Sequence, residues 1–372
     1  MAGLRLRIVH TESSLGWGGQ ELRILAEAEG LARRGHTVRI VCPQEARLYR
    51  EAQARGIDVR ALPIARKRVP ALAALAAALR AEAPQVLCTH SSTDSWLGAL
   101  AARVLRGPPA IVRLRHISAP VPRNALSRWL YRQAARVVTT GEALRRELIA
   151  RLGLDPARVV SVPTGADPAR FRPGDRRAAR ARLGLPAEAF VVGVVATLRS
   201  WKGHRYLVEA IGRLPERFQL LVVGDGPQRE PLAAQIAALG LERRVHLVGE
   251  RADVLPWLHA LDAFALPSYA NEGVPQALVQ AMLVGLPSVV TLAGAIDELA
   301  AHERTALVVP PRNAHALAEA LARLAADSAL AREMGEAARR HCVENHTLER
   351  MLDRMEALYL EVTRRPAGGP RA

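Results

Sequence analysis

The chain has 372 residues, which fits two ordinary α/β domains, and 49% hydrophobic residues can supply their cores. No apolar run is long enough to span a membrane, and the first residues read as a strand rather than a signal peptide. The net charge of +16 would suit a polyanion, but with 4% aromatic residues and no nucleic-acid motif we expect no specific nucleic-acid partner. The cysteines Cys42, Cys88 and Cys342 are widely spaced and fit buried residues of a reducing cytoplasm.

Short apolar runs alternate with helical patterns through the first half of the chain. The predicted strands cover residues 5–10, 37–42, 59–63, 85–90, 110–114, 136–140 and 159–163. Helical patterns between them include residues 21–34, 71–81, 95–105 and 144–152. This alternation is typical of a doubly wound parallel sheet in an α/β protein.

The pattern restarts after residues 169–186, a polar, arginine-rich segment that we interpret as a linker. Further strands are predicted at residues 190–196, 219–223, 245–248, 263–266, 288–291 and 306–309, followed by an alanine-rich helix at 314–340. We therefore expect an N-terminal Rossmann-like domain at 1–168 and a C-terminal one at 187–346. The last helix, at 347–364, is long enough to pack back on the first domain.

Residues 270–287 hold the most informative motif. Glu272 lies at the turn that opens an apolar helix, and Gln280 follows eight positions later. Eight positions are about two helical turns, so we expect both side chains on one face. The free N–H groups at the start of such a helix suit an anion such as a phosphate. A buried helix with an acidic residue near its start is the alternative.

Other polar or glycine-rich segments follow predicted strands, where parallel sheets bind their ligands. Arg199 and Lys202 come after strand 190–196 and can neutralise a diphosphate, although a solvated basic loop is the alternative. Glycines at Gly18 and Gly19, and again at Gly224 and Gly226, allow the backbone to turn sharply near a phosphate. No Gly-x-Gly-x-x-Gly occurs, so a dinucleotide site is not supported.

Three further strand ends in the first half carry polar side chains. His90 follows strand 85–90, where a structural histidine is the alternative to a site residue. Arg113, Arg115 and His116 close the next strand and can contact a phosphorylated or lipid-linked acceptor. Arginines and aromatic residues at helical spacing in residues 123–132 suit either an anionic lipid surface or packing on their own domain.

Together these motifs resemble the retaining GT-B glycosyltransferases of glycosyltransferase family 4, group 1 type. That family carries Glu, seven residues and a second Glu, then Ala-Met, a small residue, Gly and Pro-Val-Val. This chain has Glu272 and then Gln280, Met282, Gly285 and Pro287, so an amide replaces the second carboxylate. The resemblance covers nearly the whole chain and implies two Rossmann-like domains that face each other across a cleft.

The resemblance also implies roles for individual residues. Arg199 and Lys202 would act on the leaving diphosphate, Glu272 on the donor sugar, and His90 would lie near that sugar. Gln280 would hold the ribose, because an amide both donates and accepts hydrogen bonds. The implied donor-binding residues are Gly18, Gly19, Gly224, Gly226, Glu250, Arg251, Gly273, Val274, Gln276 and Gln280. The implied acceptor side comprises Arg113, Arg115 and His116.

The expected activity is transfer of a sugar from a nucleotide-diphosphate sugar, a UDP-sugar first, to a lipid-linked or envelope glycan. No Asp-x-Asp pair occurs, so we expect neither a metal nor another cofactor. The expected location is the cytoplasm, with possible peripheral contact at the inner face of the plasma membrane. A nucleotide-sugar epimerase of the same fold and a noncatalytic basic nucleic-acid-binding module are the alternatives.

Overall fold

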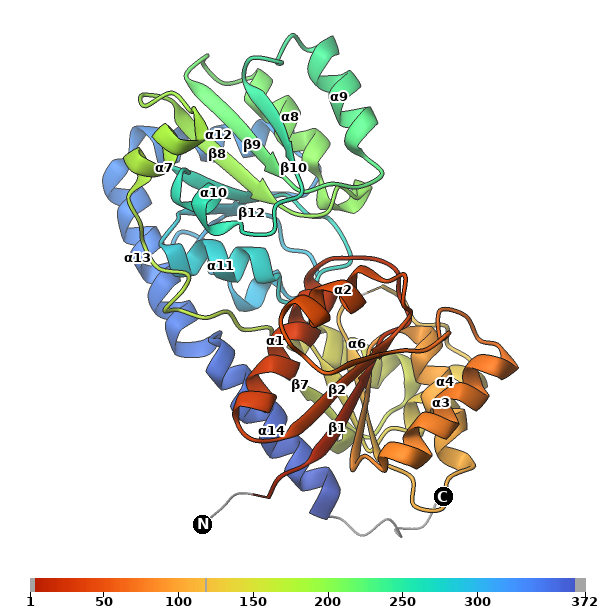
Figure 1. The fold of residues 1–372 in the computed structure, drawn as a ribbon. Helices are drawn as coiled ribbons and strands as arrows, with labels where there is room; N and C mark the ends of the chain where they lie inside the picture. The colour runs from red at the N-terminus through yellow and green to blue at the C-terminus, as the bar shows by residue number, and fades with distance from the viewer. Residues whose placement is uncertain (1–3, 118, 365–372) are drawn as a thin grey trace. The chain divides into compact units, whose positions relative to one another are not determined.

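The computed structural model describes residues 4–117 and 119–364, and it divides into two α/β units (Figure 1). The first unit holds the described residues up to Pro163 and those from Glu349 onward. The second unit is Thr164–Leu348. Each unit is built on one parallel sheet, as predicted, and is described by itself.

The first unit has a seven-stranded parallel sheet in the order β3-β2-β1-β4-β5-β6-β7. Helices cover both faces of this sheet (Figure 1). The elements are β1 (Arg7–Thr11), α1 (Gly19–Arg33), β2 (Thr37–Cys42), α2 (Arg47–Ala54), β3 (Val59–Ala61), α3 (Val69–Glu82), β4 (Val86–Thr89), α4 (Ser92–Arg103), β5 (Ala110–Arg115), α5 (Ala125–Arg132), β6 (Arg136–Thr139), α6 (Glu142–Leu152), the 3-10 helix η1 (Pro156–Arg158) and β7 (Val159–Ser161).

The second unit has a six-stranded parallel sheet in the order β10-β9-β8-β11-β12-β13. Its elements are α7 (Arg176–Leu183), β8 (Phe190–Val195), η2 (Ser200–Lys202), α8 (His204–Gly212), β9 (Phe218–Val223), α9 (Arg229–Ala238), β10 (Val245–Gly249), α10 (Leu255–His259), β11 (Ala263–Leu266), α11 (Gln276–Val284), β12 (Ser288–Val290), η3 (Ile296–Glu298), β13 (Leu307–Val308), α12 (Ala314–Ala326) and α13 (Ser328–Asn345). The chain then continues into α14 (Leu348–Arg364).

The central strands of the second sheet are buried on both faces. Val192 and Val194 of β8 belong to one hydrophobic cluster, and Val191 belongs to the cluster on the other face. Successive side chains of a strand point to opposite faces, so a continuous run of valines fills both layers. This is why the apolar runs of the sequence predicted the strands well.

Two predicted segments differ from the structure. Residues 169–186 are not a simple linker, because they contain α7, which Asp175 caps by accepting a hydrogen bond from the Ala178 N–H at 3.0 Å. Arg180 of α7 is buried and forms an ion pair with Asp262. The helix predicted at 314–340 is split at Asp327, which ends α12 and caps α13 through the Leu330 N–H at 2.9 Å.

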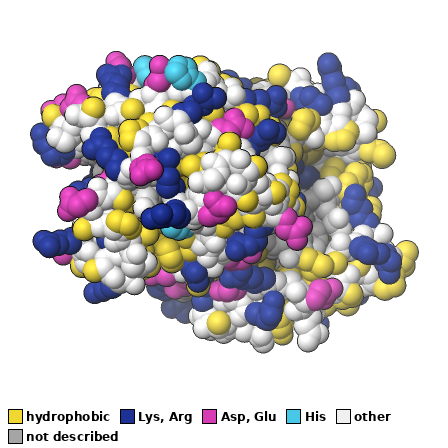
Figure 2. Space-filling model, turned by 90° about the horizontal axis from the view of Figure 1, so that it is seen from above, with side chains coloured by type: hydrophobic (Ala, Val, Ile, Leu, Met, Phe, Trp, Pro, Cys, Tyr) yellow, Lys and Arg dark blue, Asp and Glu magenta, His cyan; other side chains and the backbone are white. Residues whose placement is uncertain are grey.

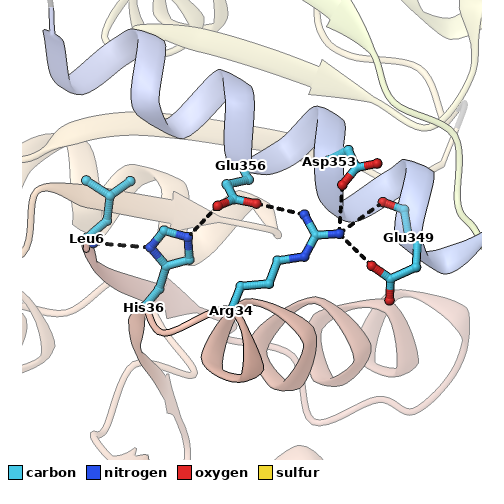
Figure 3. Close-up of polar contacts among 6 residues, drawn as sticks. All are labelled: Leu6, Arg34, His36, Glu349, Asp353 and Glu356. Carbon is cyan, nitrogen blue, oxygen red and sulfur yellow. Dashed lines mark hydrogen bonds and ion pairs between the residues drawn. The ribbon is translucent and has the colours of Figure 1, made fainter. Parts of the chain in front are cut away.

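Helix α14 packs on the first unit through an apolar stripe. Leu352 lies so close to α1 that a Cβ on Gly30 would come within 2.4 Å of its side chain. Beside the stripe, Arg34 reaches three carboxylates of α14 at 2.6–2.7 Å: Glu349, Asp353 and Glu356 (Figure 3). His36 lies between Glu356 and the backbone N–H that precedes β1. We call these five side chains the α14 clamp.

The excess of basic residues is not gathered into one area of the face seen in Figure 2. Lys and Arg side chains are scattered over that face with Asp and Glu between them. None of the helices in the described part of the chain is both long and apolar enough to cross a lipid bilayer.

Candidate functional site

The second sheet reverses its strand order between β8 and β11, because β9 and β10 follow on one side of β8 and β11 lies on the other. Ligands of open α/β sheets bind at the carboxyl ends of the strands beside such a switch point. The loop after β8 carries Lys202, and the loop after β11 carries Glu272. Lys202 Nζ lies 2.6 Å from Glu272 Oε1, so the fold pairs two predicted site residues that are 70 positions apart.

Close backbone packing holds this ion pair in place. Gly294 has a φ of +62°, and a Cβ there would lie 1.9 Å from the carbonyl oxygen of Glu272. Asn271, just before Glu272, adopts a left-handed φ of 59°. Gly203 follows Lys202 with a φ of +74°, and a Cβ there would lie 2.1 Å from the carbonyl oxygen of Pro267. Only glycine fits both close approaches, which fixes the two loops against each other.

The glycines after β9 act in the same way. A Cβ on Gly224 would lie 2.0 Å from the Ala196 carbonyl oxygen, and one on Gly226 would lie 2.8 Å from the Leu198 carbonyl oxygen. Both glycines have left-handed φ values. They therefore shape the loop that leads from β8 to Lys202.

The remaining basic residues of this region are exposed. Arg199 lies with its Cζ 5.8 Å from the ring centre of Trp201 and has no ion-pair partner among the described residues. Arg251 donates a hydrogen bond to the Val248 carbonyl at 3.0 Å and lies over Trp257. Arg251 and the exposed Glu250 follow β10, which β9 separates from β8.

Helix α11 begins later than the sequence indicated. It starts at Gln276 behind Pro275, and Glu272 lies before it in the loop. The expectation that Glu272 and Gln280 share one helical face is therefore wrong. The reason is Pro275, which disfavours helical geometry at the residue before it, Val274. Buried Gly273 and Val274 carry the backbone into the helix.

Two amide side chains of α11 lack hydrogen-bond partners within the described part of the chain. Gln276 Oε1 is buried and accepts no hydrogen bond. Gln280 is buried, and its amide has no hydrogen-bond partner among the described residues. Buried polar groups are normally hydrogen-bonded, so these amides are suited to meet a polar ligand.

His204 and Ser268 had no predicted role; His204 begins α8 two positions after Lys202, and Ser268 lies in the loop after β11. The side-chain polar atoms of both are buried without a partner. Burial, helped by the charge of Lys202, lowers the pKa of His204 to about 3, so its ring is neutral. Nothing in their spacing distinguishes them from ordinary buried polar residues.

The first sheet reverses its order between β1 and β4. There His10 Nδ1 lies 3.0 Å from His90 Nε2, and His90 Nδ1 lies 2.9 Å from His116 Nε2. The three rings are stacked and buried; His10 lies in β1, and His90 and His116 directly follow β4 and β5. Burial lowers the pKa of each ring, that of His90 and His116 well below its usual value. We call this arrangement the histidine chain.

Buried carboxyl groups lie beside the histidine chain. Asp94 accepts hydrogen bonds from Thr11 at 3.1 Å and from the N–H groups of His90 and Ser91 at 2.8 Å. Glu12 accepts one from the Ser14 N–H at 2.7 Å. Burial, together with the charge of Asp94, raises the pKa of Glu12 to about 8. Neither carboxyl group was predicted as a site residue, although both follow strands.

The predicted acceptor-side arginines lie on β5 next to α5. Arg113 is buried with its Cζ 4.1 Å from the ring centre of Tyr131, and its Nε and Nη1 have no partner. Arg115 donates to the carbonyl of Ala119, while its Nε has no partner.

The glycine turn after β1 leads directly into α1. Gly18 precedes the helix without a side-chain cap, and Gly19 is its first residue. A Cβ on Gly19 would meet nothing within 4 Å, so no protein group fills the space beside it. The buried carboxyl group of Glu21 accepts hydrogen bonds from the N–H groups of Gly18 and Glu21, so this turn is partly satisfied by the chain itself.

Two family models match this chain. The model Glycosyltransferase Family 4 matches residues 17–170, and the model Glycosyl transferases group 1 matches residues 175–341. An Escherichia coli protein named UDP-Gal:alpha-D-GlcNAc-diphosphoundecaprenol alpha-1,3-galactosyltransferase is 29% identical over 80% of each chain. The 2-deoxystreptamine glucosyltransferase of Streptomyces kanamyceticus is 32% identical over 55% of each, so that match spans about half of the relative.

Solved structures show the same fold. The Anabaena protein HepE in complex with UDP-glucose has a TM-score of 0.87 at 23% identity, covering 96% of this chain and 100% of that one. WaaG, a glycosyltransferase involved in lipopolysaccharide biosynthesis, has a TM-score of 0.73 at 18% identity, covering 97% and 100%. The fold is GT-B, and the chain belongs to the glycosyltransferases of family 4, group 1 type.

Proposed function

We propose that this chain is a retaining glycosyltransferase that moves a sugar from a UDP-sugar to a hydroxyl group of a lipid-linked or envelope glycan. The observation that carries the proposal is the Lys202–Glu272 ion pair at the switch point of the second sheet. A sugar phosphate bound there meets a cation for its phosphates and a carboxylate for its hydroxyl groups. The family to which the chain belongs gives the reaction class.

On the second unit, Arg199 and Lys202 stabilise the charge that develops on the departing diphosphate without a metal ion. Fixed cations aimed at a developing charge can lower a barrier by several kcal/mol. Glu272 accepts hydrogen bonds from the donor sugar. Its ion pair with Lys202 holds the carboxylate in position before the donor binds.

The other donor contacts come from backbone and amide groups. Gln280 binds the ribose, and the unpartnered Gln276 with the N–H groups near Gly273 and Val274 binds the sugar or its phosphate. Gly224 and Gly226 keep the loop after β8 in place. Glu250 and Arg251 lie near the base, and the backbone at Gly18 and Gly19 meets the diphosphate.

The acceptor binds to the first unit. The unpartnered N–H groups of Arg113 and Arg115 suit a phosphate of the acceptor, and His90 and His116 lie by the reacting hydroxyl. The name of the Escherichia coli relative, which includes a diphosphoundecaprenol acceptor, supports this class. A lipid-linked acceptor also favours peripheral contact with the inner face of the plasma membrane. Helix α5 fits that contact, because Leu126 is 65% exposed among exposed arginines.

A thermal-shift screen with UDP-, GDP- and ADP-sugars tests the donor first. A UDP-sugar should raise the melting temperature, since a ligand that binds only the folded state stabilises it.

The double variant Arg199→Ala, Lys202→Ala should keep its fold and lose both the shift and turnover with a lipid-diphosphate glycan. Nuclear magnetic resonance of the product then reads the anomeric configuration. Isomerisation of the nucleotide sugar without any acceptor would identify an epimerase instead.

A further inference from the structure

The histidine chain uses both ring nitrogens of His90. Nε2 of this ring contacts His10 at 3.0 Å, and Nδ1 contacts His116 at 2.9 Å. His90 therefore has no ring nitrogen left for a substrate. The chain ends in His10 Nε2, which is buried without a partner, and in His116 Nδ1.

The two contacts link the protonation of all three rings. Burial keeps the rings neutral at neutral pH, and the nearby Arg23 opposes a positive charge on His90 and His116. A neutral imidazole carries one N–H and one lone pair. Each contact needs an N–H on one ring and a lone pair on the other. If Nε2 of one ring carries the proton, Nε2 of the other two rings must therefore carry it as well. The same holds for Nδ1, and only these two arrangements satisfy both contacts.

The surroundings of His10 select one arrangement. The carboxyl group of Glu27 is fully buried near His10, and its charge opposes the lowering of the pKa of that ring by burial. Tyr359 donates to Glu27 Oε1, whereas Glu27 Oε2 has no hydrogen-bond partner among the described residues and lies 3.8 Å from Nε of the buried Arg23. The negative charge of Glu27 favours a proton on the ring nitrogen of His10 that does not contact His90. That nitrogen is Nε2, because Nδ1 already contacts His90.

The accessible end of the chain is His116. Its relative exposure is 8%, against 0% for His10 and 5% for His90. Nδ1 of His116 has no hydrogen-bond partner among the described residues, and it does not belong to their buried unpartnered atoms. It is thus the one ring nitrogen of the chain that a ligand can reach.

We propose that His10 and His90 are positioning residues that hold His116 in the Nε2–H tautomer, so that His116 Nδ1 accepts a hydrogen bond from a substrate hydroxyl group. This inference rests on the proposed function, because it assumes that the first unit binds a hydroxyl-bearing acceptor. It moves the substrate contact from His90 to His116.

Long-range proton–nitrogen spectra of the nitrogen-15-labelled full chain, without ligand and at neutral pH, test the tautomer directly. The two ring nitrogens of an Nε2–H imidazole give a shift pattern distinct from that of an Nδ1–H or a charged ring. Comparison with His10→Asn and His116→Gln assigns the signals. All three rings should show the Nε2–H pattern, and an Nδ1–H or charged ring among them would overturn the proposal.

Kinetics test the consequence. His10→Leu removes the hydrogen-bond acceptor for His90 and should lower kcat/KM about tenfold, as loss of groups that orient a ligating histidine does. His116 should then show both tautomers. In His10→Asn the amide oxygen replaces Nδ1 as acceptor and should restore most of the rate. His315→Leu, an exposed histidine of α12, is the control and should change neither readout.

If His10→Leu and His10→Asn lowered kcat/KM equally and the His116 tautomer did not change, His10 would act only in packing. That result would overturn the proposal. The spectra of the unliganded wild-type protein do not depend on donor or acceptor. A shared Nε2–H tautomer in a protein that transfers no sugar would therefore contradict only the proposed function. Transfer by a protein with mixed tautomers would contradict only this inference.

Discussion

At the switch point of the first sheet, neighbouring loops meet through uncharged groups: His10 contacts His90, and Ser13 contacts Ser91 at 2.5 Å. At the switch point of the second sheet, they meet through the Lys202–Glu272 ion pair. Both sites are buried, and at the second each of the two charges has its partner. In the first, burial lowers the histidine pKa values and raises those of Glu12 and Asp94.

The difference indicates which ligand each unit can hold. Uncharged donors and acceptors match hydroxyl groups without a desolvated charge to neutralise. A fixed cation beside a carboxylate matches a phosphate joined to a sugar. The comparison thus supports an acceptor on the first unit and a donor on the second. Substitutions at either switch point can test it.

The largest expected effect comes from removing the cation of the second switch point. Lys202→Ala should lower kcat about 100-fold to 1000-fold, which is the usual loss when one group that stabilises a developing charge is removed. The melting temperature should fall as well, because the variant leaves the Glu272 carboxylate, whose side chain is only 6% exposed, without its partner. Steady-state rates and thermal melts measure the two effects.

Arg205→Ala is the matched control for Lys202→Ala. Arg205 lies on α8, three positions further along the chain, and pairs only loosely with Glu209 at 3.9 Å. Its loss should leave the rate unchanged. If Lys202→Ala and Arg205→Ala reduced the rate equally, the ion pair would have no special role and the contrast between the units would fail.

The second prediction concerns the backbone behind Glu272. In Gly294→Ala the new Cβ would overlap the Glu272 carbonyl oxygen, so we expect a loss of about 3 kcal/mol in the free energy of unfolding and a displaced carboxylate. Gly240→Ala has nearly the same φ, +66° against +62°, but no atom within 4 Å of its Cβ. It should cost only about 1 kcal/mol. Urea unfolding of both variants measures the difference, and equal losses would refute the role of the close contact.

A third prediction concerns the buried acid of the first switch point. The pKa of Glu12 is raised from 4.5 to about 8, so the folded state keeps its proton after the unfolded chain has lost it. Stability from this group is therefore present below pH about 4.5 and is lost as the pH rises towards 8. The side chain of Glu12→Gln cannot ionise. Between pH about 4.5 and 8 its free energy of unfolding should therefore rise relative to that of the wild type by about 2 kcal/mol or more, since one pKa unit corresponds to about 1.4 kcal/mol.

Urea unfolding at pH 4, 6 and 8 measures the gain of Glu12→Gln. The control is Glu303→Gln, because the hydrogen bond from Arg323 lowers the pKa of Glu303 and the sign is reversed. That variant should lose stability relative to the wild type as the pH rises through the acidic range. A Glu12→Gln curve parallel to the wild type would show that Glu12 is charged in the folded protein.

Strand positions were predictable because both faces of each sheet are buried, so continuous valine-rich runs mark the strands. Lys202 and Glu272 were found through motifs that follow strands. The ion pair between them could not be predicted, because it forms only when β11 lies next to β8. The order of the strands in the sheet decides that. The same holds for His10, which reads as one more strand residue until β4 is placed beside β1.

The linker prediction failed for a different reason. A segment rich in arginine reads as polar and exposed, yet Arg180 is buried, with its guanidinium group hydrogen-bonded to the carbonyl oxygens of Ala187, Ala189 and Ala260. Composition cannot distinguish such an arginine from a solvated one, because all of its partners except Asp262 are backbone groups that any sequence provides. Only the fold shows which carbonyl groups are unpaired nearby.

The smallest expected effect lies away from both switch points. The α14 clamp lies at the amino end of β1 rather than at its carboxyl end (Figure 3). Arg34→Ala should cost about 1–2 kcal/mol, because it leaves three carboxylates of one helix facing each other. Arg33→Ala removes only an exposed i,i+4 pair with Glu29 and should cost about 0.5 kcal/mol or less. Hydrogen exchange in α14 should rise only in Arg34→Ala, while kcat stays unchanged. A fall in kcat would mean that the uncharged switch point of the first unit depends on the charges at its opposite edge.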